Sequence, residues 1–221
     1  MHHILDIMKV KTFKGGYDDN FSYLIWDDSK LEGAIIDPSV SPELILNFIT
    51  DNNINLSKIL ITHTHHDHIS CLDTFLQRYP NLVIHAYQDT RHKFDNHFSG
   101  LNHQDKIFLG DIVLTALYTP GHYDDCICYW DSEEKVIFTG DTVFVGRTGR
   151  TINRFSNISQ LFHSIYDIIL QLPMDTIIYP GHDYGDVETI SISNNIKNSR
   201  FFSSTSKCDF IAVMKDYELN R

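Results

Sequence analysis

The stretch ITHTHHDHIS (residues 61–70) places four histidines and one aspartate within the six positions 63–68. An apolar run, residues 59–61, leads directly into it and is typical of a buried strand. Imidazole and carboxylate groups are common ligands of zinc and iron in proteins. The stretch therefore predicts a metal site at the end of a buried strand. If that strand continued, His63 and His65 would point to the same side and His66 would point away.

Three other apolar stretches end in the same kind of residue. VLTALYT (113–119) runs into Pro120-Gly121-His122, KVIFT (135–139) into Gly140-Asp141, and TIIY (176–179) into Pro180-Gly181-His182. If these strands share one core, their ends can meet at one edge. The candidate ligands are then His63, His65, Asp67, His68, His122, Asp141 and His182.

This set is too large for a single tetrahedral zinc, because it contains five imidazoles and two carboxylates. It suits two divalent ions, about 3.5–4 Å apart, that share a carboxylate and a bridging water. Iron or manganese also accepts a mixed set of nitrogen and oxygen ligands. The remaining histidines, among them His85, are interpreted as solvated or packed side chains, although His92, His97 and His103 are also candidates for substrate contact.

Composition narrows the class of protein. A chain of 221 residues can form one sizeable core, and a net charge of −11 leaves no general basic face for nucleic acid. Neither a secretory signal nor an apolar run long enough to span a membrane is evident in the sequence. The four cysteines are scattered, which is typical of a reducing, cytoplasmic setting. The sequence makes no prediction of oligomeric state.

The order of apolar stretches predicts two β-sheets covered by helices in a single domain. Helices are expected at 41–52, 70–80 and 156–173, the last capped by Ser156, with two weaker helices near 186–198 and 206–217. Residues 87–105 are expected to form a polar loop with one helical turn. Strands are expected within residues 8–16, 20–28, 33–39, 58–62, 81–87, 110–120, 126–131, 135–141 and 175–182.

The motifs THTHHDH, TPGH, FTGDTVF and YPGHDYG, in this order, resemble the metallo-β-lactamase superfamily over residues 8–185. The resemblance implies an α+β fold, a four-layer αββα sandwich, over residues 1–185. Residues 186–221 would form a short helical extension packed on the same domain. By position, one metal takes His63, His65 and His122, the other takes Asp67, His68 and His182, and Asp141 bridges them. Asp67 and Asp141 are the implied catalytic carboxylates.

Within that superfamily, DNFSYLIWD, GDTVFVGRTGR and PGHDY are similar to the glyoxalase II (hydroxyacylglutathione hydrolase) and persulfide dioxygenase branch. The intact second ligand set favours hydrolysis of a glutathione-type thiolester by a metal-bridging hydroxide. The HDY triplet and Cys126 favour the alternative, a dioxygenase with a single Fe(II) on His63, His122 and Asp141. A metallo-hydrolase of another small ester, lactone or phosphodiester also stays open, as does a metal-bearing protein with little turnover.

The expected substrate is a small anionic thiol derivative such as glutathione. Arg147, Arg150 and Arg154 follow Asp141 closely and can hold a carboxylate. The resemblance places substrate contacts at Arg150 and Tyr184. The chain departs from the family at positions 123–125, which read Tyr-Asp-Asp instead of a small Thr-x-Gly turn, and at 147–152. These departures bear on glutathione recognition rather than on metal binding.

Overall fold

A computed structural model of the chain describes residues 7–94 and 97–220. It contains two mixed six-stranded sheets. In the first sheet, strands β1 to β3 pair antiparallel and strands β3 to β6 pair parallel. The strands of this sheet, in spatial order, are β1 (Met8–Gly15), β2 (Asn20–Asp27), β3 (Glu32–Ile36), β4 (Asn55–Leu60), β5 (Val83–Tyr87) and β6 (Phe98–Leu101).

The second sheet is antiparallel except for one pair, β10 and β11, which runs parallel. This pair matters for the site because parallel strands bring their carboxyl ends to the same edge of a sheet. In spatial order the strands are β12 (Ile190–Ser191), β11 (Ile177–Pro180), β10 (Val136–Gly140), β9 (Ile127–Asp131), β8 (Ile112–Tyr118) and β7 (Lys106–Leu109).

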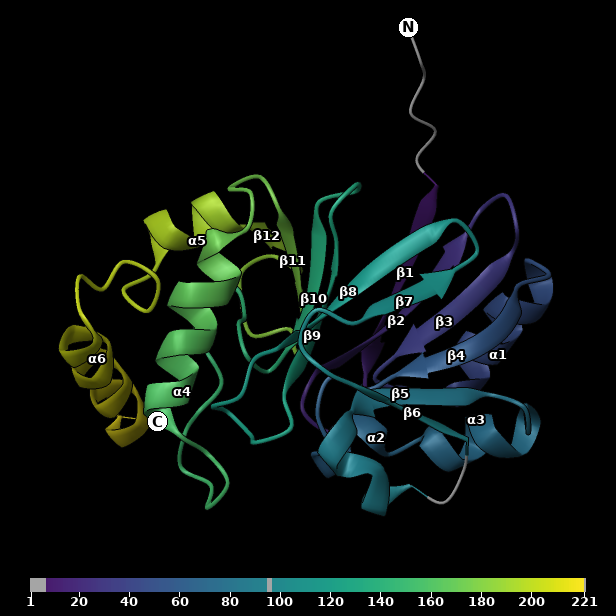
Figure 1. The fold of residues 1–221 in the computed structure, drawn as a ribbon, viewed down its shortest axis with the longest axis horizontal. Coiled ribbons are helices and arrows are strands. Elements are labelled where there is room, and N and C mark those ends of the chain that lie inside the picture. Colours follow the sequence, from purple (N-terminus) through teal and green to yellow (C-terminus); the bar gives the residue numbers. More distant parts are fainter. Residues whose placement is uncertain (1–6, 95–96, 221) are drawn as a thin grey trace, which may run out of the picture.

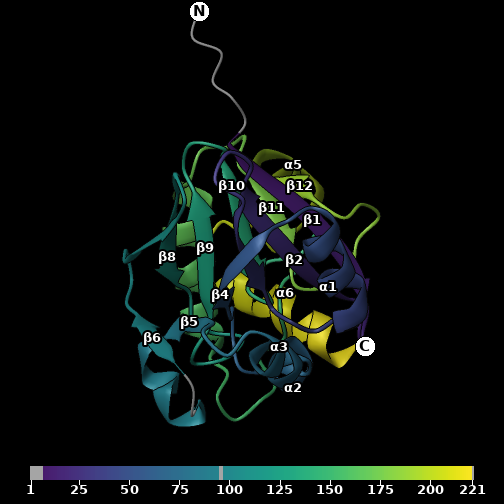
Figure 2. The same ribbon diagram turned by 90° about the vertical axis from the view of Figure 1, so that its right-hand side faces the viewer.

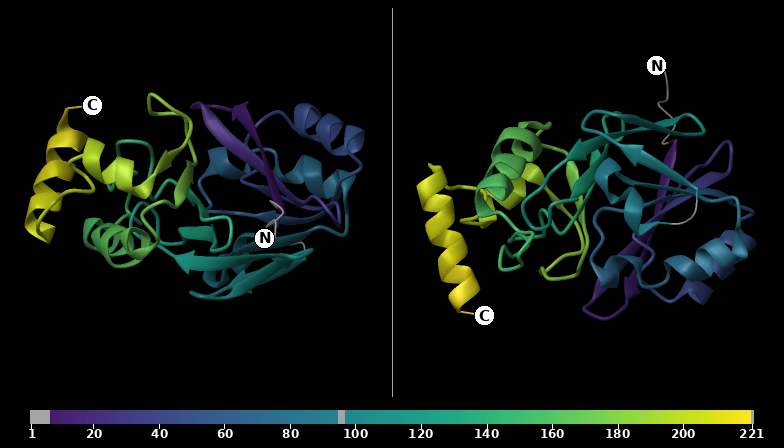
Figure 3. Two further views of the ribbon diagram at one scale, coloured as in Figure 1. Left: turned by 90° about the horizontal axis from the view of Figure 1, so that it is seen from above. Right: turned by 60° about the horizontal axis from the view of Figure 1, so that its bottom comes forward.

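The two sheets pack face to face and enclose the central core (Figure 1). Tyr23 and Leu60 of the first sheet pack there with Tyr129 and Phe138 of the second, and all four side chains are buried. The Tyr23 hydroxyl donates to the carbonyl of Pro180, so even the polar atom of this ring is paired across the sheets. Helices cover both outer faces, and Figure 3 shows the resulting four layers. The predicted αββα sandwich is confirmed.

Three helices cover each outer face. On the first sheet, Ile45, Ile49 and Phe75 pack on apolar strand residues such as Ile35 and Ile59. On the second sheet, apolar residues of α4 and α5 pack with those of β10 and β11, and α6 packs against α4. Figure 2 looks onto the side of α1 and α3, with α6 at the back. Among the described residues, no helix is both long and apolar enough to cross a membrane. The helices are α1 (Pro42–Asp51), α2 (His66–Ile69), α3 (Leu72–Arg78), α4 (Ile158–His163), α5 (Ile192–Asn198) and α6 (Lys207–Leu219).

Two local expectations are wrong. The side chain of Asn157, not Ser156, caps α4, because it accepts from the backbone amides of Ser159 and Gln160. Asparagine and serine are both good caps, so composition alone does not choose between neighbours. The helical turn expected within the polar loop at 87–105 is present as a 3-10 helix (Gln88–Lys93), but this segment also contains strand β6, which was not expected. Strand β6 pairs with β5 along an edge, where few of its side chains are buried, so no apolar pattern marks it.

His85 in β5 is a half-buried histidine without polar partners. Neither ring nitrogen makes a hydrogen bond with any residue that the structure describes. Burial, reinforced by the nearby Lys58 ammonium, lowers the pKa of His85 from 6.5 to about 4. The unfolded chain therefore binds a proton here that the folded chain excludes between these two pH values, and folding stability falls as the pH drops through this interval.

We expect His85→Leu to reduce the acid sensitivity of folding. Between pH 6.5 and 4 the wild type should lose stability faster than the variant, by up to about 1.4 kcal/mol per pH unit. Urea unfolding of both proteins, without metal, at a series of pH values measures the two slopes. The other histidines titrate in both proteins, so the difference reports His85 alone. Parallel slopes would show that His85 keeps an ordinary affinity for protons.

Candidate metal centre

The strand ends that the sequence singled out do meet at one edge of the sandwich. Residues 63–68 follow β4 of the first sheet, whereas His122, Asp141 and His182 follow β8, β10 and β11 of the second. Two backbone hydrogen bonds join the sheets at this edge: the amide of Ile127 donates to the carbonyl of Thr62, and the amide of Phe21 to that of Gly181, both at 2.8 Å. The edge is therefore a fixed junction that holds ligands from both sheets.

Three imidazoles converge at one side of this edge. Nδ1 of His65 lies 2.9 Å from Nε2 of His63 and 3.0 Å from Nε2 of His122. All three nitrogens lie within 4.8 Å of one another, as the ligands of one ion do. The structure thus brings together the three residues expected to share the first metal.

A second group lies beside the first. Nε2 of His68 and Nε2 of His182 are 3.1 Å apart. Oδ2 of Asp67 lies 3.4 Å from Nε2 of His182 and 3.6 Å from that of His68. The amide of Asn20 donates to the same oxygen at 2.9 Å and fixes its position. This group matches the residues expected to hold the second metal.

Asp141 lies between the two groups. Its Oδ1 is 3.2 Å from Nε2 of His68 and 3.4 Å from Nε2 of His182, whereas its Oδ2 is 3.5 Å from Nε2 of His122. Oδ1 is buried and makes no hydrogen bond with a described residue. Such an orphaned oxygen is uncommon in a folded protein and commonly marks an ion or water. Together with the converging imidazoles, it fits a pair of divalent ions such as zinc or iron.

The outward nitrogens of the ligand rings are held by other groups. Nδ1 of His68 lies 2.8 Å from Oδ2 of Asp37, Nδ1 of His182 lies 2.7 Å from the carbonyl of Asp18, and Nδ1 of His122 lies 2.9 Å from the carbonyl of Arg150. A proton on each Nδ1 leaves the lone pair of Nε2 pointing into the centre, which is the form that binds metal.

The candidate metal ligands strongly influence one another's pKa values. Burial raises the pKa of Asp141, but the imidazoles of His182 and His68 outweigh it, so the pKa lies well below its usual value. Burial lowers the pKa of His182, but Asp141 and Asp67 more than compensate and raise it to about 10. Burial, together with His122, lowers the pKa of His65 to about 4. A metal must therefore displace protons from some of these groups as it binds.

The expected strand geometry of His63 and His65 is wrong, although their convergence is not. Strand β4 ends at Leu60, and α2 begins at His66, so the two histidines lie on the irregular segment between them. Their rings meet because this segment bends, not because strand side chains alternate. His66 is exposed and lines the cavity over the centre, rather than pointing away from it.

This cavity has a volume of about 570 Å³ and is open to Arg150 and Tyr184, the two expected substrate contacts. The Tyr184 ring stacks on His182 with centroids 4.8 Å apart, and its hydroxyl donates to Asp18. The three arginines do not gather here. Arg147 lies over the Tyr184 ring, Arg154 lies over the Phe155 ring, and among the described arginines Arg150 alone lines the cavity.

A model of the metallo-β-lactamase superfamily matches residues 15–182. The chain belongs to the metallo-β-lactamase superfamily. A probable polyketide biosynthesis zinc-dependent hydrolase of Bacillus velezensis is 29% identical over 213 residues, which are 96% of this chain and 93% of that protein. The hydroxyacylglutathione hydrolase of Francisella tularensis subsp. novicida is 36% identical over 167 residues, which are 75% of this chain and 63% of that enzyme.

Among solved structures of the superfamily, ETHE1 from Myxococcus xanthus superimposes with a TM-score of 0.86 at 28% identity. The match covers 96% of this chain and 92% of ETHE1. Together with the hydroxyacylglutathione hydrolases, it confirms the predicted branch of the superfamily.

Substitution of Gly181 tests how tightly the candidate metal centre is packed. A Cβ at this position would lie 2.5 Å from Oδ1 of Asp141 and 2.8 Å from Cε1 of His68. We expect Gly181→Ala to displace the Asp141 carboxylate and to lower the activity about 100-fold, as small misplacements of reacting groups do. Metal content and turnover measure the effect, and thermal unfolding checks that the variant is folded. A folded variant with full activity would show that Asp141 can move freely.

Proposed function

We propose that this superfamily enzyme hydrolyses a small anionic thiolester, in the manner of glyoxalase II. The observation that carries the proposal is the complete second ligand set, Asp67, His68 and His182, beside the first. A mononuclear enzyme needs only one set. Two of the relatives are themselves hydrolases, one of them described as zinc-dependent.

Two divalent ions bound here would supply a hydroxide at neutral pH and polarise the carbonyl oxygen of the substrate. The chain itself contributes position and charge. Asp67, whose side chain is 29% exposed, faces the cavity and can accept the proton of the attacking water. Arg150 is exposed in the same cavity and can hold a carboxylate of the substrate. A thiolate is a good leaving group, so the reaction needs no strong general acid.

A persulfide dioxygenase with one iron on His63, His122 and Asp141 is the alternative. The overall likeness to ETHE1 favours it, since that match covers nearly the whole chain. In this chain Oδ2 of Asp141 lies 3.5 Å from Nε2 of His122, so these two of the three residues can reach the same ion. The ligand geometry is therefore compatible with both reactions, and the reaction itself must be measured.

The deciding experiment is a parallel assay of the iron-loaded and zinc-loaded proteins. Release of thiol from S-lactoylglutathione, with two metals per chain and no oxygen uptake, is the expected result. Rapid oxygen consumption with glutathione persulfide, by protein that carries one iron, would overturn the hydrolase proposal. Failure of both substrates would contradict both reactions.

A further inference from the structure

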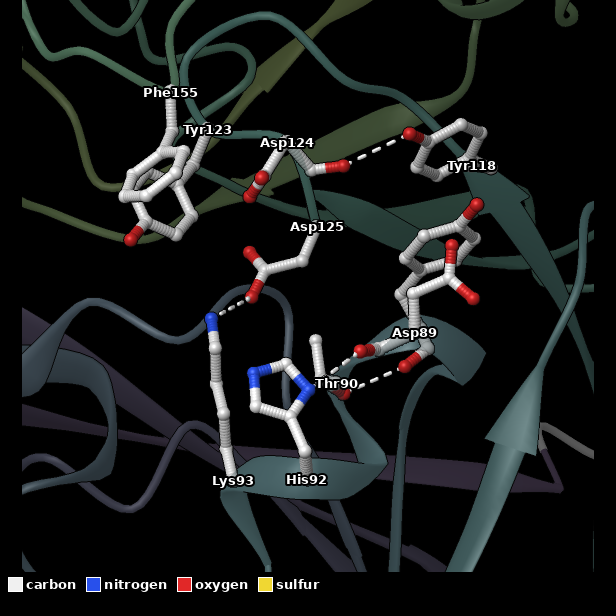
Figure 4. Close-up of a pocket in the computed structure, with 10 residues that line it drawn as sticks. Asp89, Thr90, His92, Lys93, Tyr118, Tyr123, Asp124, Asp125 and Phe155 are labelled. Carbon is white, nitrogen blue, oxygen red and sulfur yellow. Dashed lines mark hydrogen bonds and ion pairs between the residues drawn. The ribbon is translucent and has the colours of Figure 1, made fainter.

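A second cavity, about 320 Å³ in volume, has the lining that Figure 4 shows. Tyr123 forms the wall between this cavity and the metal cavity: it lines the second cavity, and its ring centroid lies 4.3 Å from that of His65, which lines the first. The volume is within the range of small-molecule sites. Tyr123, Asp124 and Asp125 all line this second cavity, and they are the positions at which the sequence departs from the family turn. We call it the side pocket.

One charged pair in the side pocket is already satisfied. Nζ of Lys93 lies 3.1 Å from Oδ2 of Asp125, whose side chain is only 4% exposed. The same carboxylate accepts hydrogen bonds from the hydroxyl and the amide of Thr64. Lys93 and Asp125 therefore neutralise each other and fasten the segment between His63 and His65.

Two carboxylates in the side pocket have no such partner. The side chains of Asp89 and Asp124 are exposed, and neither carboxylate makes a hydrogen bond or ion pair with a residue that the structure describes. Figure 4 shows them on different walls, Asp89 beside Thr90 and Asp124 near Tyr123. With Lys93 and Asp125 cancelling, the pocket keeps an excess of two negative charges, which favours a cation and opposes an anion.

Aromatic rings complete the walls. Tyr87 and Tyr118 stack with centroids 4.1 Å apart, and the rings of Tyr123 and Phe155 meet edge to face at 5.4 Å. The Tyr118 hydroxyl donates to the carbonyl of Asp124 and holds that loop in place. Nζ of Lys93 lies 5.2 Å from the Tyr123 centroid and the Arg154 guanidinium lies 4.2 Å from the Phe155 centroid, so these two rings already attract cations of the chain itself. The attraction for a further cation therefore comes mainly from the carboxylates.

We propose that the side pocket binds a protonated amine on one arm of the substrate. The proposal rests on the proposed thiolester hydrolysis for the position of the reacting bond over the metal centre. The arm passes over Tyr123, so Asp89 and Asp124 select substrates by charge. Arg150 binds a negative group of the substrate in the metal cavity. The side pocket binds a positive group on another part of the same substrate.

The first test measures binding without any reaction. Metal-loaded wild type is titrated with hexylammonium, hexanol and hexanoate, and binding is followed by NMR of the tyrosine rings. Hexylammonium should bind roughly tenfold more tightly than hexanol, and the double variant Asp89→Asn/Asp124→Asn should lose that advantage. Asp51→Asn, which neutralises an exposed carboxylate at the end of α1, is the matched control and should keep it. Equal binding of hexylammonium and hexanol, or preference for hexanoate, would overturn the proposal.

The second test uses turnover. Thiolesters of N-acetylcysteamine that carry an ω-aminohexanoyl or a hexanoyl group differ only at the end of the acyl arm. The amine should raise kcat/KM roughly tenfold in wild type and in Asp51→Asn, but not in the double variant. If neither ester is cleaved while hexylammonium binding still depends on Asp89 and Asp124, the side pocket stands, and the thiolester proposal fails if S-lactoylglutathione is not cleaved either. If both esters are cleaved equally and hexylammonium shows no preference, the side pocket proposal fails alone.

Discussion

Replacing Asp141 with asparagine should lower kcat/KM for the substrate by about a thousandfold, which corresponds to about 4 kcal/mol of transition-state stabilisation. The carboxylate faces both ligand groups, with Oδ1 near His68 and His182 and Oδ2 near His122. An asparagine amide keeps one oxygen but replaces the other with an NH₂ group that has no lone pair for a metal. It also removes the negative charge that balances the two cations. Turnover and metal content of purified Asp141→Asn, compared with wild type, measure the loss.

The control for this prediction is Asp51→Asn, which makes the same chemical change on the exposed end of α1. It should keep two metals and full activity. Asp141→Asn should fall to one metal or fewer and still unfold cooperatively. If it kept both metals and lost less than about tenfold in kcat/KM, Asp141 would not bridge the centre.

The candidate metal ligands could be predicted from the sequence because each is marked by a short local pattern. A buried apolar strand that stops at a histidine or aspartate can be recognised in a single chain, and four such strands predict one edge of a sandwich. Asp37 follows strand β3 in the same way, at the end of the stretch GAIID, so a signal for its position beside His68 was also present. The expected strand at 33–39 runs through Asp37, so this residue was not singled out.

Other parts of the site carry no such signal. The groups that orient His182 and His122 are backbone carbonyls of Asp18 and Arg150, and any residue type supplies a carbonyl. The convergence of His63 and His65 depends on a bend after β4, which apolar periodicity does not describe. The side pocket forms where the segment around Tyr123 meets the 3-10 helix Gln88–Lys93, and only the packed fold brings these segments together.

Asp37→Asn should weaken the second metal site about 10–100-fold, as loss of a group that orients a ligand does. Asp37 is 2% exposed, and its Oδ2 accepts from the Thr62 hydroxyl at 2.6 Å while lying 2.8 Å from Nδ1 of His68. Its φ of +48° is one that asparagine adopts readily, so the backbone should be preserved. The new NH₂ group would face the Nδ1 proton of His68, and this ring would turn away from the centre. Zinc titration against a competing chelator measures both sites.

Asp27 provides a matched control for Asp37. It is also a fully buried aspartate, but it ends β2 at the far edge of the sheet, where it accepts from the amides of Ser29 and Asp111. Both Asp37→Asn and Asp27→Asn should lower the free energy of unfolding by about 3 kcal/mol, because each breaks a buried charged network. Only Asp37→Asn should weaken the second metal site. If the two variants lost equal stability and both kept wild-type zinc affinity, Asp37 would support the fold without supporting the metal, and His68 would hold its orientation through packing alone.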